Sequence, residues 1–456
     1  MPAPAFVPDT IAAIATPPGR GGIGIVRVSG ANLQRLVEGI VAKPLQPRVA
    51  THATFRGPRG EPIDEGLALM FPAPGSYTGE AVLELHGHGS PAALRTLLAR
   101  CVELGARVAQ PGEFTKRAYL NGKLDLAQAE SVADLIEAST ATAARAAARS
   151  LTGAFSREVD ALVEDVTNLR MYTEATLDFP EEDIDFLRAA DASGRLQAIR
   201  ERLASLLARA RDGVRLARGL TVVLAGRPNV GKSSLMNRLV RDEAAIVTAV
   251  AGTTRDTVER QVEIGGIPLE VVDTAGLRET DDVVERIGIE RARAAIARAD
   301  LVIVIVDARD AKADEVVEAP DILALPSSAM RVVVHNKSDL AGVRPRVERR
   351  EGSSHIWLSA LTGEGMDLLE TEVLALAGAG NLGEDAFIAR ERHVIALRAA
   401  QAHLDAARDQ LGGERPALEL FAEELRRAQL SLSQITGEFT ADDLLGVIFS
   451  RFCIGK

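Results

Sequence analysis

Cysteine is scarce in this sequence, with Cys101 and Cys453 the two present among 456 residues. Two cysteines are too few for a disulfide framework or a cysteine zinc site, so any special role for them is redox or catalytic. Long apolar runs are lacking as well. No run approaches the length of a membrane span, although 46% of the residues are hydrophobic, as in a folded soluble protein.

The first residues, Met1 to Pro8, lack the basic-then-apolar order of a signal peptide. Together with the missing apolar runs, this predicts a cytoplasmic protein that has no membrane partner. A surplus of positive charge is also absent, because the formal net charge is -11. That charge argues against a surface that is basic throughout and against tight nonspecific binding of nucleic acid. A nucleic-acid partner would need a local basic patch.

The sequence does contain a phosphate-binding loop. Residues Gly226-Arg227-Pro228-Asn229-Val230-Gly231-Lys232-Ser233 fill every required position of GxxxxGK[ST], between an apolar β-type run, Leu220 to Ala225, and a helix-like segment, Ser234 to Val240. Glycine lets such a loop curl so that backbone NH groups face phosphate, while Lys232 neutralises the outer phosphates and Ser233 can bind magnesium. The flanking strand and helix favour a nucleoside polyphosphate site over a glycine-rich turn that happens to carry Lys-Ser.

Four further segments follow in the order and spacing of a GTPase. Thr254 offers a second hydroxyl to the magnesium, and Asp273 ends an apolar strand, Leu269 to Val272, near the metal. Asp339 can accept two hydrogen bonds from guanine, a pair that adenine does not offer. In the fourth segment, Ser359-Ala360-Leu361, backbone groups can meet guanine O6. Each segment alone reads as a polar loop, but five matches in order predict GTP. The residues predicted to contact it are Asn229, Val230, Gly231, Lys232, Ser233, Ser234, Gly252, Thr253, Thr254, Asp273, Thr274, Ala275, Gly276, Asn336, Lys337, Ser338, Asp339, Ser359, Ala360 and Leu361.

Leu277 stands where Ras-like switches place the glutamine that orients the attacking water, and a leucine cannot do so. The polar candidates lie in the charged segment from Arg278 to Glu285, most of which reads as a solvated switch loop. The sequence identifies no arginine as a finger residue. Another source of positive charge must therefore act in the transition state.

The length predicts two to four domains. Residues 218-384 read as a doubly wound, Ras-like P-loop α/β GTPase domain. Residues 122-217 and 385-456 are rich in helix formers, with helix-spaced apolar positions such as Leu196, Ile199, Leu203 and Leu206. They predict one α-helical domain interrupted by an inserted GTPase domain, with two separate bundles as the alternative.

Residues 1-121 differ, because they are rich in glycine and proline and carry short alternating strands such as Ala81 to Leu85. They predict a separate α/β domain. The loop from Thr16 to Gly24 suggests a dinucleotide fingerprint but fails it, since Arg27 stands where a glycine is required. His86 and His88 share one side of a strand, but two ligands without a third are weak evidence for a metal.

Several motifs are spread along the chain. They are Ala15 to Gly21, Glu84-Leu85-His86-Gly87-His88-Gly89, Leu120 to Leu126, Asp178-Phe179-Pro180-Glu181-Glu182 and the terminal Cys453-Ile454-Gly455-Lys456. Together they resemble the MnmE (TrmE) family of GTPases, which modify the wobble uridine of certain tRNAs. The resemblance runs from end to end of the chain.

The resemblance implies an N-terminal domain similar to folate-dependent aminomethyltransferases, which also forms a homodimer. This domain would bind 5-formyl- or methylene-tetrahydrofolate as the one-carbon donor, and Arg27, Glu84, Lys123 and Lys456 match the family's folate contacts. A carboxylate suits the amino edge of a pterin, and the cations suit its carbonyl and glutamate charges. From spacing alone, Arg27 and Lys123 read as solvated charges and Glu84 as a strand-edge residue.

The resemblance also implies a source for the missing charge, a potassium ion that stimulates hydrolysis and pairs two GTPase domains. Asn229, Thr248, Val250 and Thr253 match its ligands, and oxygen donors suit such a hard cation. The matching segment extends the predicted GTP contacts to Thr248, Ala249, Val250 and Ala251. Glu285 matches the catalytic glutamate, and Ser233 and Thr254 are the magnesium ligands.

Cys453 matches a tail cysteine needed for tRNA modification and not for GTP hydrolysis, although a cysteine four residues from a chain end is ordinarily a frayed thiol. The implied partner is MnmG, a flavoprotein carrying FAD, which forms a hetero-oligomer with these GTPases. The pair adds an aminomethyl or carboxymethylaminomethyl group to C5 of uridine in tRNA.

Two other functions compete with this interpretation. The first is a ribosome-assembly GTPase of the Era or EngA kind, but no GxxG loop with basic flanks, as in an RNA-binding KH module, follows residue 385. The second is a nucleotide-gated scaffold whose partner does all of the modification chemistry. The sequence leaves this second alternative open, because no nucleophile beyond Cys453 stands out.

Overall fold

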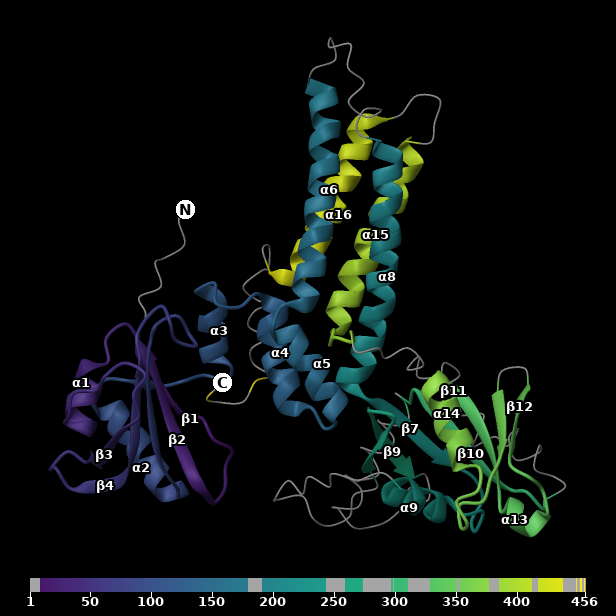
Figure 1. Cartoon of the computed structure of the whole chain (residues 1–456), viewed down its shortest axis with the longest axis horizontal. Helices are drawn as coiled ribbons and strands as arrows, with labels where there is room; N and C mark the ends of the chain where they lie inside the picture. The colour runs from purple at the N-terminus through teal and green to yellow at the C-terminus, as the bar shows by residue number, and fades with distance from the viewer. Residues whose placement is uncertain are drawn as a thin grey trace. The chain divides into compact units, whose positions relative to one another are not determined.

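The computed structural model (Figure 1) describes residues 9–178, 191–242, 259–273, 297, 299–310, 329–350, 353–376, 385–411, 417–437, 448, 452 and 455. The chain divides into two compact units. The first comprises Met1–Ala133, Leu151–Ala190 and Ala406–Lys456, and the second comprises Asp134–Ser150 and Asp191–Asp405. Within the described ranges, no helix has the length and apolar character that crossing a membrane requires.

A six-stranded sheet with the order β3-β4-β5-β2-β1-β6 forms the N-terminal part of the first unit. Its strands are β1 (Ile11–Ile14), β2 (Gly21–Gly30), β3 (Thr51–Arg56), β4 (Pro62–Phe71), β5 (Ala81–Gly89) and β6 (Arg107–Val108). The helical elements here are α1 (Gln34–Leu36), the π-helix η1 (Val37–Val41), α2 (Pro91–Glu103) and α3 (Glu113–Leu120). The predicted α/β character of this region is confirmed.

Alternation along β5 sorts its side chains between two faces of the sheet. Leu83 and Leu85 are buried in the core that α1, η1 and α2 share with the sheet, whereas Glu84, His86 and His88 lie on the opposite face. This follows from the period of two in a strand. The sheet therefore presents acidic and imidazole groups on the face that α2 does not cover.

The glycines that suggested a dinucleotide loop belong largely to β2, so the expectation of a loop up to Gly24 was wrong. A Cβ on Gly24 would lie 2.5 Å from the Leu94 side chain of α2, and one on Gly89 would lie 2.5 Å from the carbonyl oxygen of Gly21. These glycines allow close packing of helix on sheet and of strand on strand. Gly24 therefore serves packing, whereas a Cβ on Gly22 would meet nothing within 4 Å.

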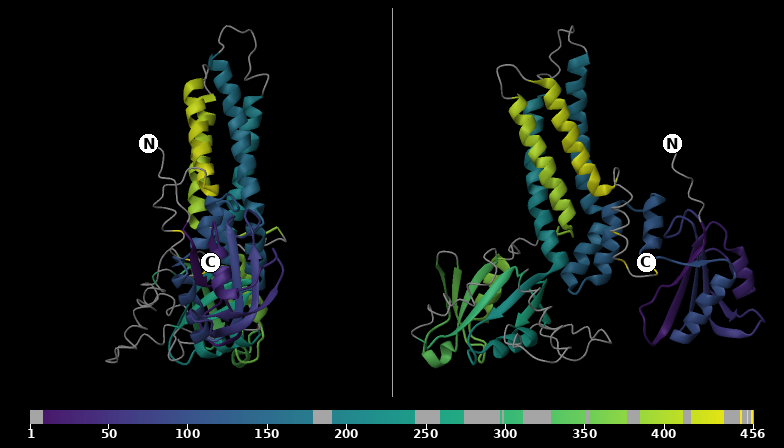
Figure 2. Two further views of the ribbon diagram at one scale, coloured as in Figure 1. Left: turned by 90° about the vertical axis from the view of Figure 1, so that its left-hand side faces the viewer. Right: turned by 180° about the vertical axis from the view of Figure 1, so that it is seen from behind.

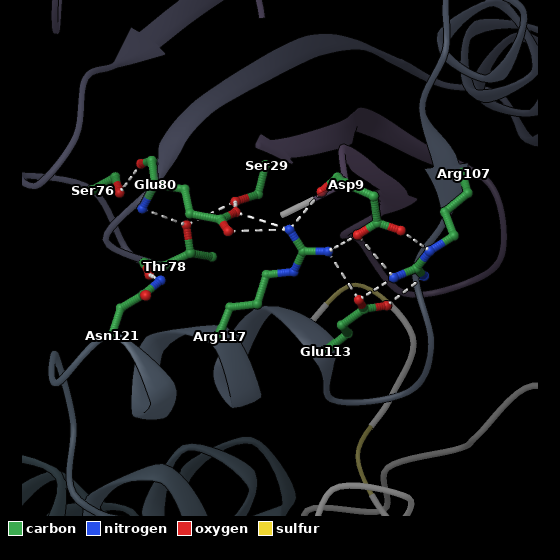
Figure 3. Close-up of polar contacts among 9 residues, drawn as sticks. All are labelled: Asp9, Ser29, Ser76, Thr78, Glu80, Arg107, Glu113, Arg117 and Asn121. Atoms are coloured by element: carbon green, nitrogen blue, oxygen red, sulfur yellow. Dashed lines mark hydrogen bonds and ion pairs between the residues drawn. The ribbon is translucent and has the colours of Figure 1, made fainter. Parts of the chain in front are cut away.

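A network of charges ties α3 to the sheet (Figure 3). The Arg117 guanidinium, 2% exposed, donates hydrogen bonds to Asp9 at 2.7 Å, to Glu80 at 3.0 Å and to Glu113 at 3.1 Å. Arg107 donates to the other Glu113 oxygen at 2.8 Å. Ser29, Thr78 and Asn121 extend the network through further hydrogen bonds. Because the charges are paired and bonded, their burial is tolerated.

Helices from both sides of the GTPase segment pair with each other. In the first unit, α6 (Ala154–Asp178) packs along α16 (Leu418–Thr436), and both views of Figure 2 show the two side by side. In the second unit, Arg200 of α8 (Ala192–Arg218) donates a 2.9 Å hydrogen bond to Asp405 of α15 (Glu391–Leu411). The predicted apolar stripe of α8 is buried throughout, with Leu196, Ile199, Leu203 and Leu206 at most 4% exposed. Two shorter helices are α4 (Leu126–Glu137) and α5 (Ala141–Leu151).

The second unit contains a seven-stranded sheet with the order β12-β13-β11-β10-β7-β9-β8. The five inner strands are parallel, and β12 and β8 are antiparallel edges. The strands are β7 (Leu220–Ala225), β8 (Glu259–Ile264), β9 (Ile267–Asp273), β10 (Leu301–Asp307), β11 (Met330–Asn336), β12 (Arg346–Arg350) and β13 (Ser353–Trp357). The helices are α9 (Lys232–Asp242), α13 (Ser338–Ala341) and α14 (Met366–Leu376). The predicted doubly wound sheet is confirmed.

Strand order determines where this sheet can bind a ligand. The chain passes from β7 to β9 on one side and to β10 on the other, so β7 lies at a topological switch point. Ligands of open α/β sheets bind outside the carboxyl ends of the strands at such a point. The predicted phosphate loop begins there, directly after β7. The predicted domain boundaries at residues 121, 217 and 384 stay predictions.

The network around Arg117 should make the N-terminal part of the first unit sensitive to acid. Burial alone would raise the pKa of the Glu113 carboxyl, but hydrogen bonds from Arg107, the Gln110 NH and Arg117 bring it below the ordinary 4.5. A carboxyl whose pKa is lowered on folding contributes stability above its ordinary pKa and loses that contribution as pH falls through the lowered value. Hydrogen exchange read by mass spectrometry, corrected for intrinsic rates, should therefore show α3 and β6 losing protection below pH 4.5.

In Glu113→Gln that loss should shrink, because the group that takes up the proton is gone. The matched control is Glu103→Gln, since Glu103 pairs with Arg100 at 3.0 Å but is 54% exposed. A Glu113 variant with the pH dependence of the wild type would contradict this account.

Candidate functional site

The phosphate loop connects the end of β7 to the start of α9. Gly226 has φ +145° and Gly231 has φ +102°, conformations that L side chains rarely adopt. A Cβ at Gly226 would lie 2.3 Å from the carbonyl oxygen of Ile305, and one at Gly231 would lie 2.2 Å from Nδ2 of Asn336. Both required glycines of the motif are thus enforced by space as well as by backbone angle.

Lys232 is the buried cation of this loop, at 8% exposure. Its Nζ donates to the carbonyl oxygens of Gly226 at 2.7 Å and Arg227 at 3.1 Å, so the loop curls around the ammonium. Lys232 is also the first residue of α9, whose N-terminal NH groups and dipole favour an anion. Ser233 follows on the exposed side of the first turn. This arrangement suits phosphate oxygens bound between the ammonium and the helix.

The Asn336 side chain joins the phosphate loop to a second loop. Its Nδ2 donates to the carbonyl oxygen of Val230 at 2.8 Å, and its Oδ1 accepts from the NH of Ala360 at 2.9 Å. Asn336 is 2% exposed. The two bonds connect the loops after β7, β11 and β13 through one amide.

Lys337 forms a second tie to the phosphate loop. Its backbone is left-handed, with φ +64°, and its Nζ donates to the carbonyl oxygen of Asn229 at 2.8 Å and to Oδ2 of Asp307 at 2.9 Å. Hydrogen bonds from Arg309 and from Lys337, in that order of effect, hold the pKa of the Asp307 carboxyl well below its usual range. Asp307 is therefore a fixed negative charge at the end of β10.

The residues predicted to read the base lie at the ends of β11 and β13. Asp339 is exposed, as a carboxylate that meets a ligand must be, whereas Ser338 is 1% exposed. The NH of Ala360, one of the backbone groups predicted to meet guanine O6, bonds to Asn336 instead. Ser359 is buried, and its hydroxyl accepts from the NH of Thr362, while Leu361 is 79% exposed.

Stacked rings join the ends of the two strands that precede the loops predicted to read the base. His335 and Trp357 are register partners on β11 and β13, and their rings stack with centroids 4.2 Å apart and planes 3° apart. The buried His355 ring completes the layer, with a 3.0 Å contact between its Nδ1 and Nε2 of His335. His335 directly precedes Asn336 in the sequence, and Trp357 comes two residues before Ser359.

Several predicted residues lie outside the part of the chain that the structure describes. They are Thr248, Ala249, Val250, Ala251, Gly252, Thr253, Thr254, Thr274, Ala275, Gly276, Glu285, Cys453 and Lys456, while Asp273 is described as the last residue of β9. Their predicted roles stay predictions.

The N-terminal sheet brings two of the predicted folate residues into contact. Nε of Arg27 on β2 donates to Oε1 of Glu84 on β5 at 2.9 Å, and the guanidinium lies 5.5 Å from the Tyr77 ring centre and 5.8 Å from that of Phe114. Nε2 of His86 lies 3.0 Å from the other Glu84 oxygen. Arg27 and Glu84 are register partners on neighbouring strands, which explains the contact.

Lys123 does not join this pair. It follows α3, with its Cγ 3.3 Å from where a Cβ on Gly79 would lie, and it has no hydrogen bond or ion pair to Arg27 or Glu84 among the described contacts. The chain end, in contrast, does reach Arg27. The carbonyl oxygen of Gly455 accepts from Arg27 Nη1 at 3.5 Å, and a Cβ on Gly455 would lie 2.5 Å from the carbonyl oxygen of Ile14.

Each histidine of β5 contacts a carboxylate side chain. His86 contacts Glu84, and the His88 ring contacts Oδ1 of Asp64 at 2.8 Å. Over the ranges that the structure covers, no group of three or more His, Cys, Asp or Glu side chains is placed to hold a metal ion.

Sequence reasoning missed Asp307 and the stacked ring layer. Asp307 follows six buried apolar residues, Leu301 to Val306, and a carboxylate directly after such a strand was a usable signal. The ring layer had no such signal, because His335, His355 and Trp357 come together only through strand register.

The loop after β7, the buried Lys232 and the Asn336 tie define a P-loop GTPase domain, accompanied by an N-terminal α/β domain and helices. Comparison with known protein families also indicates a GTP-binding protein. A family model described as "MnmE helical domain" matches residues 126–453, and one described as "GTP-binding protein TrmE N-terminus" matches residues 10–123.

Curated relatives match nearly the whole chain. Proteins named "tRNA modification GTPase MnmE" from Dechloromonas aromatica and Azoarcus sp. are each 58% identical, covering 98% of this chain and 99% and 98% of their own. The same name is carried by a Chromobacterium violaceum protein, 55% identical and covering 99% of each chain. The chain belongs to the MnmE family of tRNA modification GTPases.

A solved structure, the G domain of the T. maritima FeoB iron transporter, is similar to part of the chain. It is 27% identical and covers 35% of this chain and 98% of its own. The TM-score of this structure against the chain is 0.25.

Asn336→Ala should weaken GTP and GDP binding by about 30-fold or more, the factor that two losses of ~1 kcal/mol each give together. The substitution leaves the Val230 carbonyl and the Ala360 NH without their buried partner, and each such loss costs about 1 to 3 kcal/mol. Titration with a fluorescent GDP analogue measures the effect. Leu340→Ala, in the short helix α13 that follows β11 but 62% exposed, is the control that should bind normally. Unchanged affinity in Asn336→Ala would show that the tie does not hold the site together.

Proposed function

We propose that this protein is a potassium-stimulated GTPase that works with a flavin-binding MnmG-type partner. Together they add an aminomethyl or carboxymethylaminomethyl group to C5 of the wobble uridine of certain tRNAs, with a tetrahydrofolate derivative as one-carbon donor. The observation that carries the proposal is the Arg27–Gly455 hydrogen bond. It links Gly455, a residue of the terminal Cys-Ile-Gly-Lys motif, to the sheet face that carries Arg27 and Glu84.

The folate part rests on the chemistry of that face. Glu84 is fixed by Arg27 on one oxygen and by His86 on the other, and the rings of Tyr77 and Phe114 flank the guanidinium. A flat heterocycle with donor and acceptor edges fits such a set of one carboxylate, one guanidinium, one imidazole and two aromatic rings. Bound folate would supply the one-carbon unit, while Arg27 and Glu84 would orient it. Lys123 and Lys456 are proposed as further contacts.

The GTPase part rests on the phosphate loop. Asn229 is exposed at the turn of the loop, with φ +65°, and Lys337 anchors its carbonyl. The amide oxygen of Asn229 is a hard donor that suits potassium, with Thr248, Val250 and Thr253 as the other proposed ligands. Ser233 and Thr254 are proposed to hold magnesium, and Glu285 is proposed to orient the attacking water. Potassium would supply the charge that an arginine finger gives elsewhere.

Hydrolysis is proposed to act as a switch. Pairing of two GTPase domains within a homodimer would follow nucleotide state, and helices that flank the GTPase segment on both sides would transmit the change. The acidic net charge, -11, fits a division of labour in which the partner makes much of the contact with tRNA.

Replacing potassium by sodium should slow GTP turnover by about tenfold or more, since a finger charge is worth about 10³ to 10⁵ in rate. Steady-state phosphate release in the two chloride salts at equal ionic strength is the measurement. Nucleotide affinity, measured in parallel, should differ little between the salts. Equal turnover in both would remove potassium from the proposal.

Cys453→Ser should leave GTP turnover intact and abolish the modified nucleoside, because the tail thiol is proposed to act in the modification alone. Mass spectrometry of nucleosides from cells relying on the variant gives the readout. The matched control is Cys101→Ala, since Cys101 is buried in the sheet core and burial raises the pKa of its thiol to about 12. Normally modified tRNA in Cys453→Ser would leave GTPase switching, as in a ribosome-assembly factor or a scaffold, as the better account.

A further inference from the structure

Asp307 lies where three strands of the second unit end together. It is the last residue of β10, which runs parallel to β7 on one side and to β11 on the other, and its register partner is Asn336. Its carboxylate is 19% exposed and meets two cations. Oδ2 accepts from Lys337 at 2.9 Å, and Arg309 donates to both oxygens at 2.9 and 2.7 Å.

Lys337 needs such a partner, because its position is costly. A non-glycine residue at φ +64° is disfavoured, and the four-carbon side chain must be held in one conformation to reach the phosphate loop. Its ammonium meets one neutral acceptor there, the carbonyl oxygen of Asn229 at 2.8 Å. The Asp307 carboxylate supplies the charge that fixes the ammonium between strand end and loop.

Asn229 is the residue on which this arrangement acts. It too has positive φ, +65°, in the turn of the phosphate loop. Its carbonyl oxygen faces Lys337 and accepts a hydrogen bond from Nζ at 2.8 Å. The contacts form a chain from Asp307 to Lys337 to Asn229, separate from the Asn336 tie, which ends on Val230.

We propose that Asp307 is a positioning residue of the nucleotide site: its carboxylate holds the Lys337 ammonium against the Asn229 carbonyl and so preforms the phosphate loop. Asp307 acts through Lys337 and touches no nucleotide itself. A preformed loop binds more tightly, because less ordering is left to occur on binding.

A double-mutant cycle tests whether Asp307 acts through Lys337. The variants are Asp307→Ala, Lys337→Met, which keeps the aliphatic stem, and the two combined, titrated with a fluorescent GDP analogue in sodium buffer. Each single variant should bind the GDP analogue about tenfold more weakly than the wild type. The affinity of the combined variant should be no lower than that of the single variant with the lower affinity. Unchanged binding in Asp307→Ala, or losses that multiply in the combined variant, would overturn the inference.

Two further variants separate positioning from loss of structure. Asp307→Asn keeps the shape and one acceptor oxygen, so its affinity should lie between those of the wild type and Asp307→Ala. Arg309→Ala removes the other cation from the same carboxylate but leaves Lys337 in place, and Arg309 is 51% exposed. Its affinity should stay within about twofold of the wild type. A loss in Arg309→Ala equal to that in Asp307→Ala would mean that the charge cluster itself matters, and not the hold on Lys337.

A potassium titration of GTP turnover extends the test and rests on the proposed function, in which Asn229 binds the ion. Misplacing Asn229 should raise the half-maximal potassium concentration severalfold in Asp307→Ala but not in Arg309→Ala. Wild-type turnover indifferent to potassium would refute the proposed ion site, and the affinity cycle would still decide the role of Asp307. A potassium response identical in wild type and Asp307→Ala would overturn the link to Asn229.

Discussion

The Asn336 amide is the interaction on which the nucleotide site depends. Three parallel strands end near one another, and each is followed by a loop that must hold its shape without the support of the sheet. One side chain bonds to the Val230 carbonyl and to the Ala360 NH, so two of these loops are fixed to the third. The same side chain lies where a Cβ on Gly231 would have to be, which couples the requirement for glycine in one motif to asparagine in another.

Ion pairs between side chains connect separate segments in both units. In the second unit, Asp307 and Lys337 place an ion pair at the rim of the site, where it orients a loop. In the first unit, Arg117 is buried and bonds Asp9, Glu80 and Glu113, which fastens α3 to the sheet. The network includes Ser29, two residues along β2 from Arg27, so it adjoins the sheet face that holds Glu84.

Much of the fold could be predicted because its signals are local. The runs that became β7 and β10 are continuous apolar segments of strand length, and the burial of Leu196, Ile199, Leu203 and Leu206 follows from their helical spacing. The expected loop from Thr16 to Gly24 was wrong over Gly21 to Gly24, which belong to β2, because a glycine that permits tight packing in a sheet, as Gly24 does, looks the same in sequence as a glycine of a turn. The use of the Ala360 NH was also beyond reach, since it depends on a side chain 24 residues away.

The sequence by itself determined the phosphate loop, the guanine motif and membership in a family of GTPases, because these rest on residue types at fixed short spacing. Tertiary structure alone decided which residues support them. Asp307 meets Lys337, His335 stacks on Trp357 and Arg27 reaches both Glu84 and Gly455 because separate strands and the chain end are brought together. Contacts between distant segments depend on strand order and register, and a single sequence does not display either one.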